Sequence, residues 1–339
     1  MCFNRKKIRH SFVRLGEYAS DIINRKNGVR EDERHGGYAS DECAIIGAVV
    51  GDIIGSAHEL KGTRIKTTDF ELFPDNATFT DDTVMTMAVM KWLSEIYRIP
   101  SSSDGLVPIM KDIGLRYMEV GYGHSFKQWL RSENPEPYNS LGNGSAMRVT
   151  AAGLFGQNLE ECQRIARISA SVSHNHPEGI KGAEAIASAI HLARIFTNKE
   201  CIKAYIEKKF GYNLTRTLDE IRPSYEFDPT CPGSVPEAIV CFLEGNDVES
   251  TIRNAVSLGG DADTQACMAG AIAGAYYGTV PRLFVEKIEG ILPEEFLSII
   301  SDFLCLNNDT AKTICYEPSE DTDELRRVLG LGWDFHEII

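Results

Sequence analysis

Two short clusters of carboxylates and hydroxyls stand far apart in the chain and could bind cations together. They are Thr80-Asp81-Asp82-Thr83 and Asp261-Ala262-Asp263-Thr264. Each precedes a segment rich in alanine, methionine and glycine, a composition typical of a buried helix. Carboxylates that meet out of water repel one another and lose hydration, so a positive partner must join them. A pair of Mg²⁺ ions would supply that charge and also an electrophile for catalysis.

Helix capping is the competing explanation of these clusters. Asp and Thr at a helix start accept hydrogen bonds from free backbone N–H groups and complement the helix dipole. Capping would explain one cluster, whereas two clusters with paired carboxylates favour a shared binding site. Residues 261–264 lack the glycine and the distal glutamate of a calcium-binding loop. They also follow Gly259-Gly260 in a helical pattern, which argues against the Asp-x-Asp-x-Thr nucleophile of a phosphatase.

Three further motifs bring polar groups next to predicted helices. Residues 51–55 (Gly-Asp-Ile-Ile-Gly) continue to Glu59, which stands where the glycine-spaced helical pattern ends. Residues 142–145 (Gly-Asn-Gly-Ser) predict a turn before a helix, and free N–H groups in such a turn can bind an anion. His174 and His176 precede another helix. Without a nearby cysteine or third histidine, substrate contact or capping fits them better than zinc binding.

Nearly every strong pattern after residue 43 is helical, which predicts an all-α fold. Glycine and alanine inside these segments allow close approach, so an orthogonal multi-helix bundle fits better than a parallel sheet. The predicted helices are Cys43–Ala57, Asp82–Tyr97, Ser145–Leu154, Leu159–Val172, Gly179–Phe196, Val235–Leu243, Val248–Leu258 and Asp263–Tyr277. Residues 99–105, 133–144 and 222–233 are predicted to be surface loops because they are rich in Pro, Ser, Asn and Gly.

Composition restricts the class of protein. A chain of 339 residues with 43% hydrophobic residues can bury a large core. Its nine cysteines show no Cys-x-x-Cys spacing, which favours reduced thiols over a zinc site or a disulfide framework. A net charge of −14 argues against a general nucleic-acid-binding surface. Neither a membrane-spanning apolar run nor a signal-peptide pattern occurs, so we expect a cytoplasmic protein without a membrane partner.

The N-terminal region differs from the rest of the chain in charge. Residues 1–30 carry eight Lys and Arg against two acidic residues, whereas the remainder carries 27 basic and 47 acidic residues. We therefore divide the chain into a basic, partly helical arm with a linker at 1–42 and one domain at 43–339. Apolar residues recur in the arm at helical spacing, which favours a helix docked on its own domain or on a partner protein. These residues are Ile8, Phe12, Leu15, Ala19 and Ile22.

Taken together, the motifs resemble those of the ADP-ribosylglycohydrolases, including the dinitrogenase-reductase-activating type. Five blocks occur in the family's order and span about residues 43–280. The blocks are residues 51–59, 79–83, 142–148, 173–183 and 259–264. Each block is weak alone, but the set is specific. The basic arm precedes the first block and lies outside the resemblance.

This resemblance implies an all-α fold with two Mg²⁺ ions, or Mn²⁺, in a central cleft. By motif position, the implied metal ligands are Thr80, Asp81, Asp82, Asp261, Asp263 and Thr264. The implied contacts to the ribose and pyrophosphate of ADP-ribose are Gly142, Asn143, Gly144, Ser145 and His174. Glu59 would be a ligand or a catalytic acid. A carboxylate must stabilise an oxocarbenium-like transition state or deprotonate water, and the sequence leaves open Glu59, Asp81, Asp82 and Asp263.

The resemblance also implies a hydrolase that removes ADP-ribose from arginine side chains of modified proteins. Another branch of the family hydrolyses serine-linked ADP-ribose or O-acetyl-ADP-ribose, and the motifs do not choose between the acceptors. One subgroup looks like bacterial immunity proteins, whose N-terminal extension blocks the NAD cleft of an ADP-ribosyltransferase toxin. The arm at residues 1–40 suits that role. A binding protein that neutralises a toxin mainly by sequestration is therefore the alternative function.

Overall fold

The computed structural model describes residues 38–59, 64–96, 102–195 and 198–313, together with Glu324, Arg327 and Val328. This part of the chain is all-α, as predicted, and its β-pairing is limited to an isolated bridge between Gly142 and Thr230. The helices are α2 (Tyr38–Glu59), α3 (Asp81–Ile96), α4 (Leu106–Arg116), α5 (His124–Arg131), the 3₁₀ helix η2 (Asn143–Ser145), α6 (Thr150–Phe155), α7 (Leu159–Ser171), α8 (Pro177–Ile195), α9 (Lys199–Phe210), α10 (Leu218–Ile221), α11 (Cys231–Glu244), α12 (Val248–Val256), α13 (Ala262–Tyr277), α14 (Arg282–Ile291) and α15 (Glu294–Thr313).

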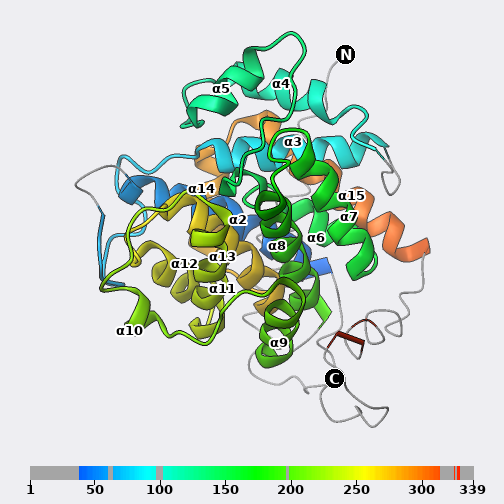
Figure 1. The fold of residues 1–339 in the computed structure, drawn as a ribbon. Coiled ribbons are helices and arrows are strands. Elements are labelled where there is room, and N and C mark those ends of the chain that lie inside the picture. Colours follow the sequence, from blue (N-terminus) through cyan, green and yellow to red (C-terminus); the bar gives the residue numbers. More distant parts are fainter. Residues whose placement is uncertain are drawn as a thin grey trace.

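The core is built on one pair of helices, α2 and α13 (Figure 1). Glycines make the contact between them. A Cβ added to Gly47 would lie 2.1 Å from the carbonyl oxygen of Gly270, and one added to Gly51 would lie 2.1 Å from that of Ala266. No larger residue fits there, so the two backbones lie in direct contact. These pairs run in opposite directions along the chain, which places the C-terminal end of α2 beside the N-terminal end of α13.

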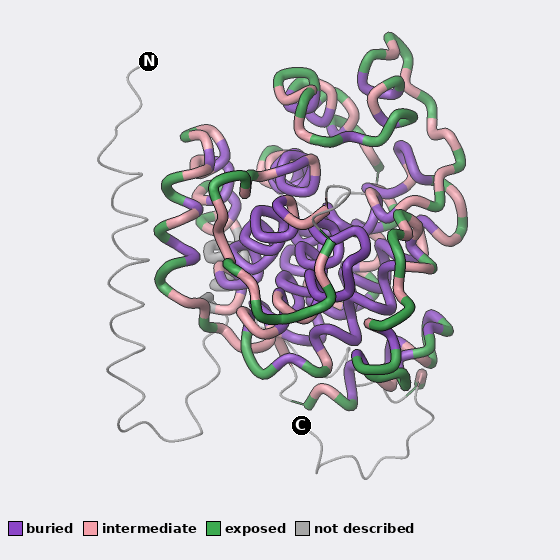
Figure 2. Tube along the Cα trace, turned by 90° about the vertical axis from the view of Figure 1, so that its left-hand side faces the viewer, coloured by how far each residue is buried: buried purple, intermediate pink, exposed green. Residues whose placement is uncertain are grey.

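The other helices enclose this pair. Helices α8, α11 and α12 pack on α13, whereas α14 packs on α2. Helix α3 packs on α4, α6 and α15, and both α7 and α9 pack on α8. Buried residues gather in the middle of the molecule and exposed residues on its outer turns (Figure 2). The small apolar residues that predicted buried helices are therefore in the interior.

Helix boundaries differ from the predictions by more than two residues at three places. Helix α2 begins at Tyr38, before the predicted start at Cys43. The segment predicted to be helical from Ser145 forms a 3₁₀ turn, and α6 begins only at Thr150. Helix α11 begins inside the predicted loop 222–233, because the Thr230 side chain accepts a hydrogen bond from a backbone N–H of the first turn and caps the helix.

Two predictions concern residues outside the described ranges. They are the amphipathic helix of the arm, with Ile8, Phe12, Leu15, Ala19 and Ile22, and residues 99–101 of the first predicted loop. In the described chain, no helix is both long and apolar enough to cross a membrane. The cysteines of that part are free thiols.

Candidate metal centre

Three helices bring five carboxylates to one end of the α2–α13 pair. Asp52 and Glu59 lie in the C-terminal half of α2, two turns apart and so on one face of that helix. Asp261 and Asp263 lie at the start of α13, and Asp82 lies in the first turn of α3. Free N–H groups make helix N-termini favourable for carboxylates. The antiparallel pairing of α2 and α13 therefore concentrates negative charge in one place.

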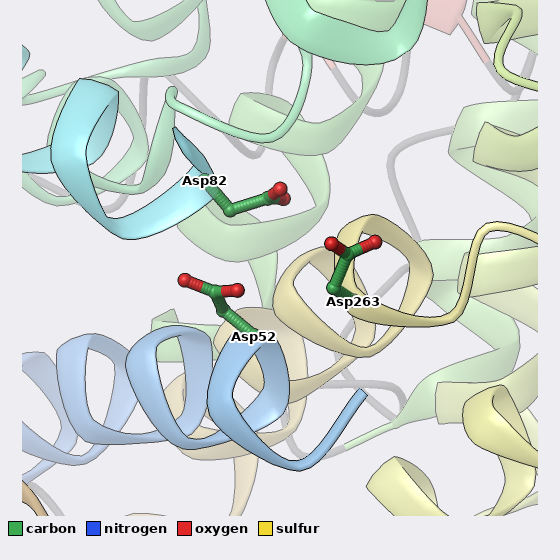
Figure 3. A group of neighbouring side chains, drawn as sticks. All are labelled: Asp52, Asp82 and Asp263. Carbon is green, nitrogen blue, oxygen red and sulfur yellow. The ribbon is translucent and has the colours of Figure 1, made fainter. Parts of the chain in front are cut away.

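The carboxylates form two groups of three that share one residue. Asp52, Asp82 and Asp263 each offer an oxygen within 4.8 Å of the others, and so do Glu59, Asp261 and Asp263. In the first group, three side chains from three helices surround one space (Figure 3). Asp263 belongs to both groups. Two neighbouring cations could therefore share one carboxylate.

Threonines orient the carboxylate of Asp52. It accepts hydrogen bonds from the backbone N–H of Thr80 at 2.9 Å and of Thr83 at 3.0 Å. It also accepts from the hydroxyls of both threonines, with a distance of 2.6 Å to Thr80 Oγ1. These four bonds join α2 to the start of α3. They fix the plane of the Asp52 carboxylate before any ligand binds.

Asp82 and Asp261 have different partners. Asp82 Oδ2 accepts a hydrogen bond from the hydroxyl of Thr264 at 3.2 Å, whereas its buried Oδ1 has no hydrogen-bond partner within the described chain. Asp261 Oδ2 accepts from the side-chain amide of Asn143 at 2.6 Å. A buried carboxylate oxygen without a donor is costly. A cation at Asp82 Oδ1 would remove that cost.

The ionised carboxylates are unfavourable here without a cation. Burial raises the pKa of Asp52 and of Asp261 to about 6. Burial, followed by the nearby Asp52 carboxylate, raises the pKa of Asp81 to about 8. The pKa values of Asp82 and Asp263 lie well above the ordinary value for the same two causes, burial and then neighbouring carboxylates. A positive ion would oppose both causes.

The donor set fits a hard divalent cation. Both groups consist of carboxylates, and neither contains a histidine or cysteine of the described chain. Mg²⁺ and Mn²⁺ prefer oxygen ligands of this kind, whereas Zn²⁺ prefers nitrogen and sulfur. The partnerless oxygen of Asp82 points to the same conclusion. The residues present therefore fit the cation expected from the sequence.

The residues predicted to bind substrate lie beside the second group. Asn143 holds one of its carboxylates, as described above. The imidazole of His174 lies against the neighbouring turn, because a Cβ added to Gly144 would stand 3.1 Å from Nε2 and one added to Gly142 would stand 3.5 Å from it. The hydroxyl of Ser145 is buried and donates to the carbonyl of Gly179 at 2.8 Å, with the carbonyl of Gly142 as a second acceptor at 3.1 Å. A ligand contact of Ser145 would therefore come from its backbone.

Comparison with known proteins decides the family. A model of the ADP-ribosylglycohydrolase family matches residues 42–312. The chain belongs to the ADP-ribosylglycohydrolase family. The resemblance inferred from the five motifs is confirmed, and the family supports a hydrolase. Membership of the chain in the subgroup of immunity proteins stays a prediction.

Several proteins are similar to this chain. ADP-ribosylhydrolase ARH3 of Homo sapiens is 28% identical over 327 residues, which cover 75% of this chain and 90% of the relative. ADP-ribosylhydrolase ARH3 of Danio rerio is 26% identical over 338 residues, which cover 78% and 90%. A solved chain of an ADP-ribosylglycohydrolase-related protein complex matches with a TM-score of 0.61 and 24% identity, covering 80% of this chain and 98% of that chain. This structural likeness supports the fold.

The fold brings most of the predicted ligands together. Three predicted carboxylates lie in the two groups, and two predicted threonines contact one of them. They are Asp82, Asp261 and Asp263, with Thr80 and Thr264 hydrogen-bonded to Asp82. Asp81 is the exception, since it belongs to neither group. Its carboxylate is half-buried and faces Gly121, where an added Cβ would lie 3.1 Å from Oδ1.

Asp52 is a group member that the sequence prediction did not include among the ligands. A signal for it exists, because Asp52 and Glu59 are seven residues apart in a helical pattern. That spacing puts both carboxylates on one face of the helix. Asp52 is also fully buried, with 0% of its surface exposed, in a helix that carries few other charges. A buried carboxylate that shares a helix face with a second acidic residue is therefore a reasonable candidate for a metal ligand.

The predicted central cleft stays a prediction. Two cavities of the described chain have volumes of about 440 and 390 Å³, and other residues line both of them. The first is lined in part by Lys66, Arg222 and Asn254. The second is lined in part by Val107 and Pro135. Neither cavity includes a member of the two carboxylate groups.

Proposed function

We propose that this chain is a Mg²⁺-dependent hydrolase that releases ADP-ribose from modified side chains, with Mn²⁺ as an alternative metal and the cytoplasm as its location. The observation that carries the proposal is the pair of carboxylate groups that share Asp263, found in a member of a glycohydrolase family. Relatives named ADP-ribosylhydrolase support the same substrate class. The reaction adds water across the bond between C1″ of ADP-ribose and the acceptor.

Burial divides the four candidate catalytic carboxylates into two pairs. Asp82 and Asp263 are buried, which suits ligands of a cation. When bound, two cations would supply positive charge that fixes the hydroxyls of the distal ribose. Glu59 and Asp81 are each half-buried, so they are less enclosed than the first two. They are therefore the candidates that take a proton from water or stabilise positive charge at C1″.

Hydrogen-bond donors on the other side of the site suit the rest of ADP-ribose. Asn143 orients Asp261 and stands in the turn that carries Gly142 and Gly144. The N–H groups of Gly142 and Asn143 already donate within the chain, to Ser140 Oγ at 3.0 Å and to the carbonyl of Pro229 at 2.8 Å. The N–H of Gly144 is therefore the backbone donor of this turn that we expect to meet a phosphate or ribose oxygen. His174 adds an imidazole nitrogen against the same turn. These donors would orient the nucleotide while the carboxylates act on the distal ribose.

Arginine is the first acceptor to test. Serine-linked ADP-ribose and O-acetyl-ADP-ribose are the alternatives, because the carboxylate groups act on the distal ribose and do not distinguish a nitrogen acceptor from an oxygen acceptor. The experiment measures release from an ADP-ribosylated arginine peptide, an ADP-ribosylated serine peptide and O-acetyl-ADP-ribose, with Mg²⁺ or with EDTA. We expect release from one of the three with Mg²⁺ and none with EDTA.

The matched control for a substitution in the carboxylate groups is the same Asp-to-Asn change at an exposed residue. Asp263→Asn should lower the rate at least about 100-fold by removing the shared ligand, whereas Asp75→Asn, at an exposed residue, should leave it within about twofold. Release that persists in EDTA would contradict the metal requirement. If ADP-ribose is released from none of the three substrates, the proposal that the chain is a hydrolase is contradicted.

We propose a second function for the basic arm, binding of an ADP-ribosyltransferase toxin by residues 1–40. The contrast between the basic arm and the acidic remainder supports it, together with the apolar spacing in the arm. If the chain acts as a hydrolase on the toxin's products, Asp263→Asn should lose protection of cells. If the chain acts mainly by sequestration of the toxin, Asp263→Asn should still protect cells, and removal of the arm should abolish protection.

A further inference from the structure

An arginine without a carboxylate partner lies close to the predicted substrate turn. Arg148 is fully buried, and its hydrogen bonds within the described chain go to neutral groups. Its Nη2 donates to the carbonyl of Ser169 at 2.6 Å and to Ser173 Oγ at 3.0 Å. Its Nε donates to Ser169 Oγ at 3.3 Å. A guanidinium buried without a counter-charge is costly, so its retention calls for a function.

Ser173 connects this arginine to His174. Ser173 Oγ lies 2.8 Å from His174 Nδ1. Arg148 donates to the same oxygen, so the hydroxyl accepts from the guanidinium. No other acceptor in the described chain takes the hydroxyl hydrogen, which leaves Nδ1 as its acceptor. The proton of a neutral imidazole is then on Nε2.

A second proton on the imidazole is unfavourable. His174 is buried, and burial first and the charge of Arg148 second lower its pKa well below the ordinary value. Tyr138 is the other titratable group in ring contact, with its centroid 5.5 Å from the imidazole. Its pKa is raised to about 12, chiefly by burial, so it faces the imidazole as a neutral phenol. Phe126 adds an apolar ring at 6.3 Å.

Hydrogen bonds from other segments hold the backbone beside this imidazole. Trp129 Nε1 donates to the carbonyl of Val172 at 2.9 Å, and the backbone N–H of Tyr138 donates to the carbonyl of Ser173 at 3.0 Å. The backbone N–H of His174 itself donates to a carbonyl of α7 at 2.8 Å. The ring is therefore placed by its surroundings and not by its own rotamer alone.

The second nitrogen of the imidazole faces the glycine turn. A Cβ on Gly144 would stand 3.1 Å from His174 Nε2, and one on Gly142 would stand 3.5 Å from it. No group of the described residues is hydrogen-bonded to Nε2, while Nδ1 has Ser173. A donor at Nε2 without a protein acceptor is available for a ligand at the turn.

We propose that Arg148 and Ser173 are positioning residues that hold His174 as a neutral imidazole with its proton on Nε2, ready to donate to an oxygen of ADP-ribose at the glycine turn. Neither positioning residue touches the ligand, since both act through His174. The identity of the ligand rests on the proposed function. The tautomer does not, because it follows from the ligand-free hydrogen bonds.

The first test measures the tautomer in the ligand-free protein by ¹⁵N NMR of the imidazole nitrogens. His174→Gln identifies the signals by deleting them. The expected wild-type spectrum has a protonated Nε2 and an unprotonated Nδ1. A wild-type His174 that is protonated on Nδ1, or on both nitrogens at neutral pH, would overturn the proposal regardless of any enzymatic activity.

The second test compares two serine variants that contact the same guanidinium. Ser173→Ala removes the hydroxyl between Arg148 and His174, whereas Ser169→Ala removes one that does not contact the imidazole. We expect Ser173→Ala to give a mixture of tautomers and to weaken ADP-ribose binding about five- to tenfold, the loss of one oriented hydrogen bond. Ser169→Ala should keep the wild-type tautomer and affinity within about twofold.

The two measurements separate the tautomer from the substrate. Equal changes in tautomer and affinity for both serine variants would show a structural effect only and contradict the relay. A wild-type tautomer as expected, in a protein that does not bind ADP-ribose, would contradict the ligand and the proposed function but retain the relay. In kinetics, Ser173→Ala should raise KM with little change in kcat, as for a contact made equally in the ground and transition states.

Discussion

At the scale of single residues, the site combines carboxylates that a folded protein would not gather without a cation. Asp82 illustrates this, because one of its oxygens has two possible donors and the other, buried, has none in the described chain. Burial and like charge both oppose ionisation of this carboxylate. The carboxylate of Asp82 can therefore bind a cation, but it lowers the stability of the metal-free protein. Substitutions can test both effects.

Asp82→Asn should change stability in opposite directions with and without metal. The amide cannot ionise, so the metal-free variant should be more stable than the metal-free wild type by about 1 kcal/mol or more. With Mg²⁺, the variant should gain much less stability than the wild type does, because a ligand is missing. Thermal melting in EDTA and in Mg²⁺ measures both. An Asp82→Asn protein that gains as much from Mg²⁺ as the wild type would contradict ligation by this residue.

The stability gained from Mg²⁺ should increase with pH. The raised pKa values, about 6 for Asp52 and about 8 for Asp81, mean that the folded metal-free state binds more protons than the unfolded chain. The contribution of these groups to the free energy of unfolding therefore falls as pH rises through the window from about 4 to 8. Denaturant unfolding with EDTA and with Mg²⁺ should show a difference that widens by at least about 2 kcal/mol between about pH 5 and pH 8. A constant difference would argue against buried, protonated carboxylates.

At the scale of elements, the α2–α13 contact determines where the carboxylates lie. Glycines of α2 fit against backbone atoms of α13 along the contact, and a Cβ on Gly55 would lie 2.4 Å from the Cα of Asp263. A wider spacing would move the start of α13 away from Asp52 and Glu59. The two groups therefore depend on residues that carry no side chain at all.

Gly51→Ala should separate these helices. Its Cβ would lie 2.1 Å from the carbonyl oxygen of Ala266, so a backbone must move, and we expect a loss of about 3 kcal/mol or more. Gly290→Ala is the matched control, because Gly290 is exposed on α14 and an added Cβ meets no atom within 4 Å. That change should stabilise by about 0.5 kcal/mol through helix propensity. Equal unfolding midpoints for the two variants would contradict the close contact.

The sequence predicts the elements of the site better than the choice of side chains within it. Glycines spaced by four in α2 and the small residues of α13 indicate buried, closely packed helices, and both are found. Adjacent residues on a helix point about 100° apart, so the local pattern does not tell how far Asp81 and Asp82 share one space. Tertiary contacts place Asp82 and Asp52 in the first group and bring Asp81 near the Asp52 carboxylate.

The turn at the predicted substrate site shows the same limit. A helix from Ser145 is a sound local prediction. The hydroxyl of Ser145 instead donates to the carbonyl of Gly179 at 2.8 Å, a residue far along the chain. Residues next to Ser145 in the sequence do not predict a hydrogen bond to a residue so distant along the chain. At this turn η2 ends at Ser145, and α6 begins only at Thr150.

At the scale of the whole molecule, a basic arm precedes an acidic domain, and the family match begins at residue 42. Helix α2 already begins at Tyr38, and Asp41 near its start pairs with Arg194 of α8 at 2.7 Å. An arm deletion that ends at residue 37 therefore keeps the first helix and its ion pair. A longer deletion would mix loss of the arm with damage to the domain.

Removal of residues 1–37 should leave hydrolysis within about twofold, because the carboxylates and their partners all lie beyond the cut. The same deletion should abolish binding to the toxin, measured by titration of the toxin with the intact and shortened chains. Unchanged toxin binding would contradict the role of the arm. A large loss of hydrolysis would show that the arm contributes to the active domain.

Metal dependence of ADP-ribose release by the wild type and by Asp263→Asn is the most direct test of the site. Asp263 is the residue common to both carboxylate groups, so its loss should affect every cation held there. Release by the wild type should increase with Mg²⁺ until it saturates, and Asp263→Asn should release at least about 100-fold more slowly at the same concentrations. Release by Asp263→Asn at the wild-type rate and with the wild-type Mg²⁺ dependence would contradict the metal centre.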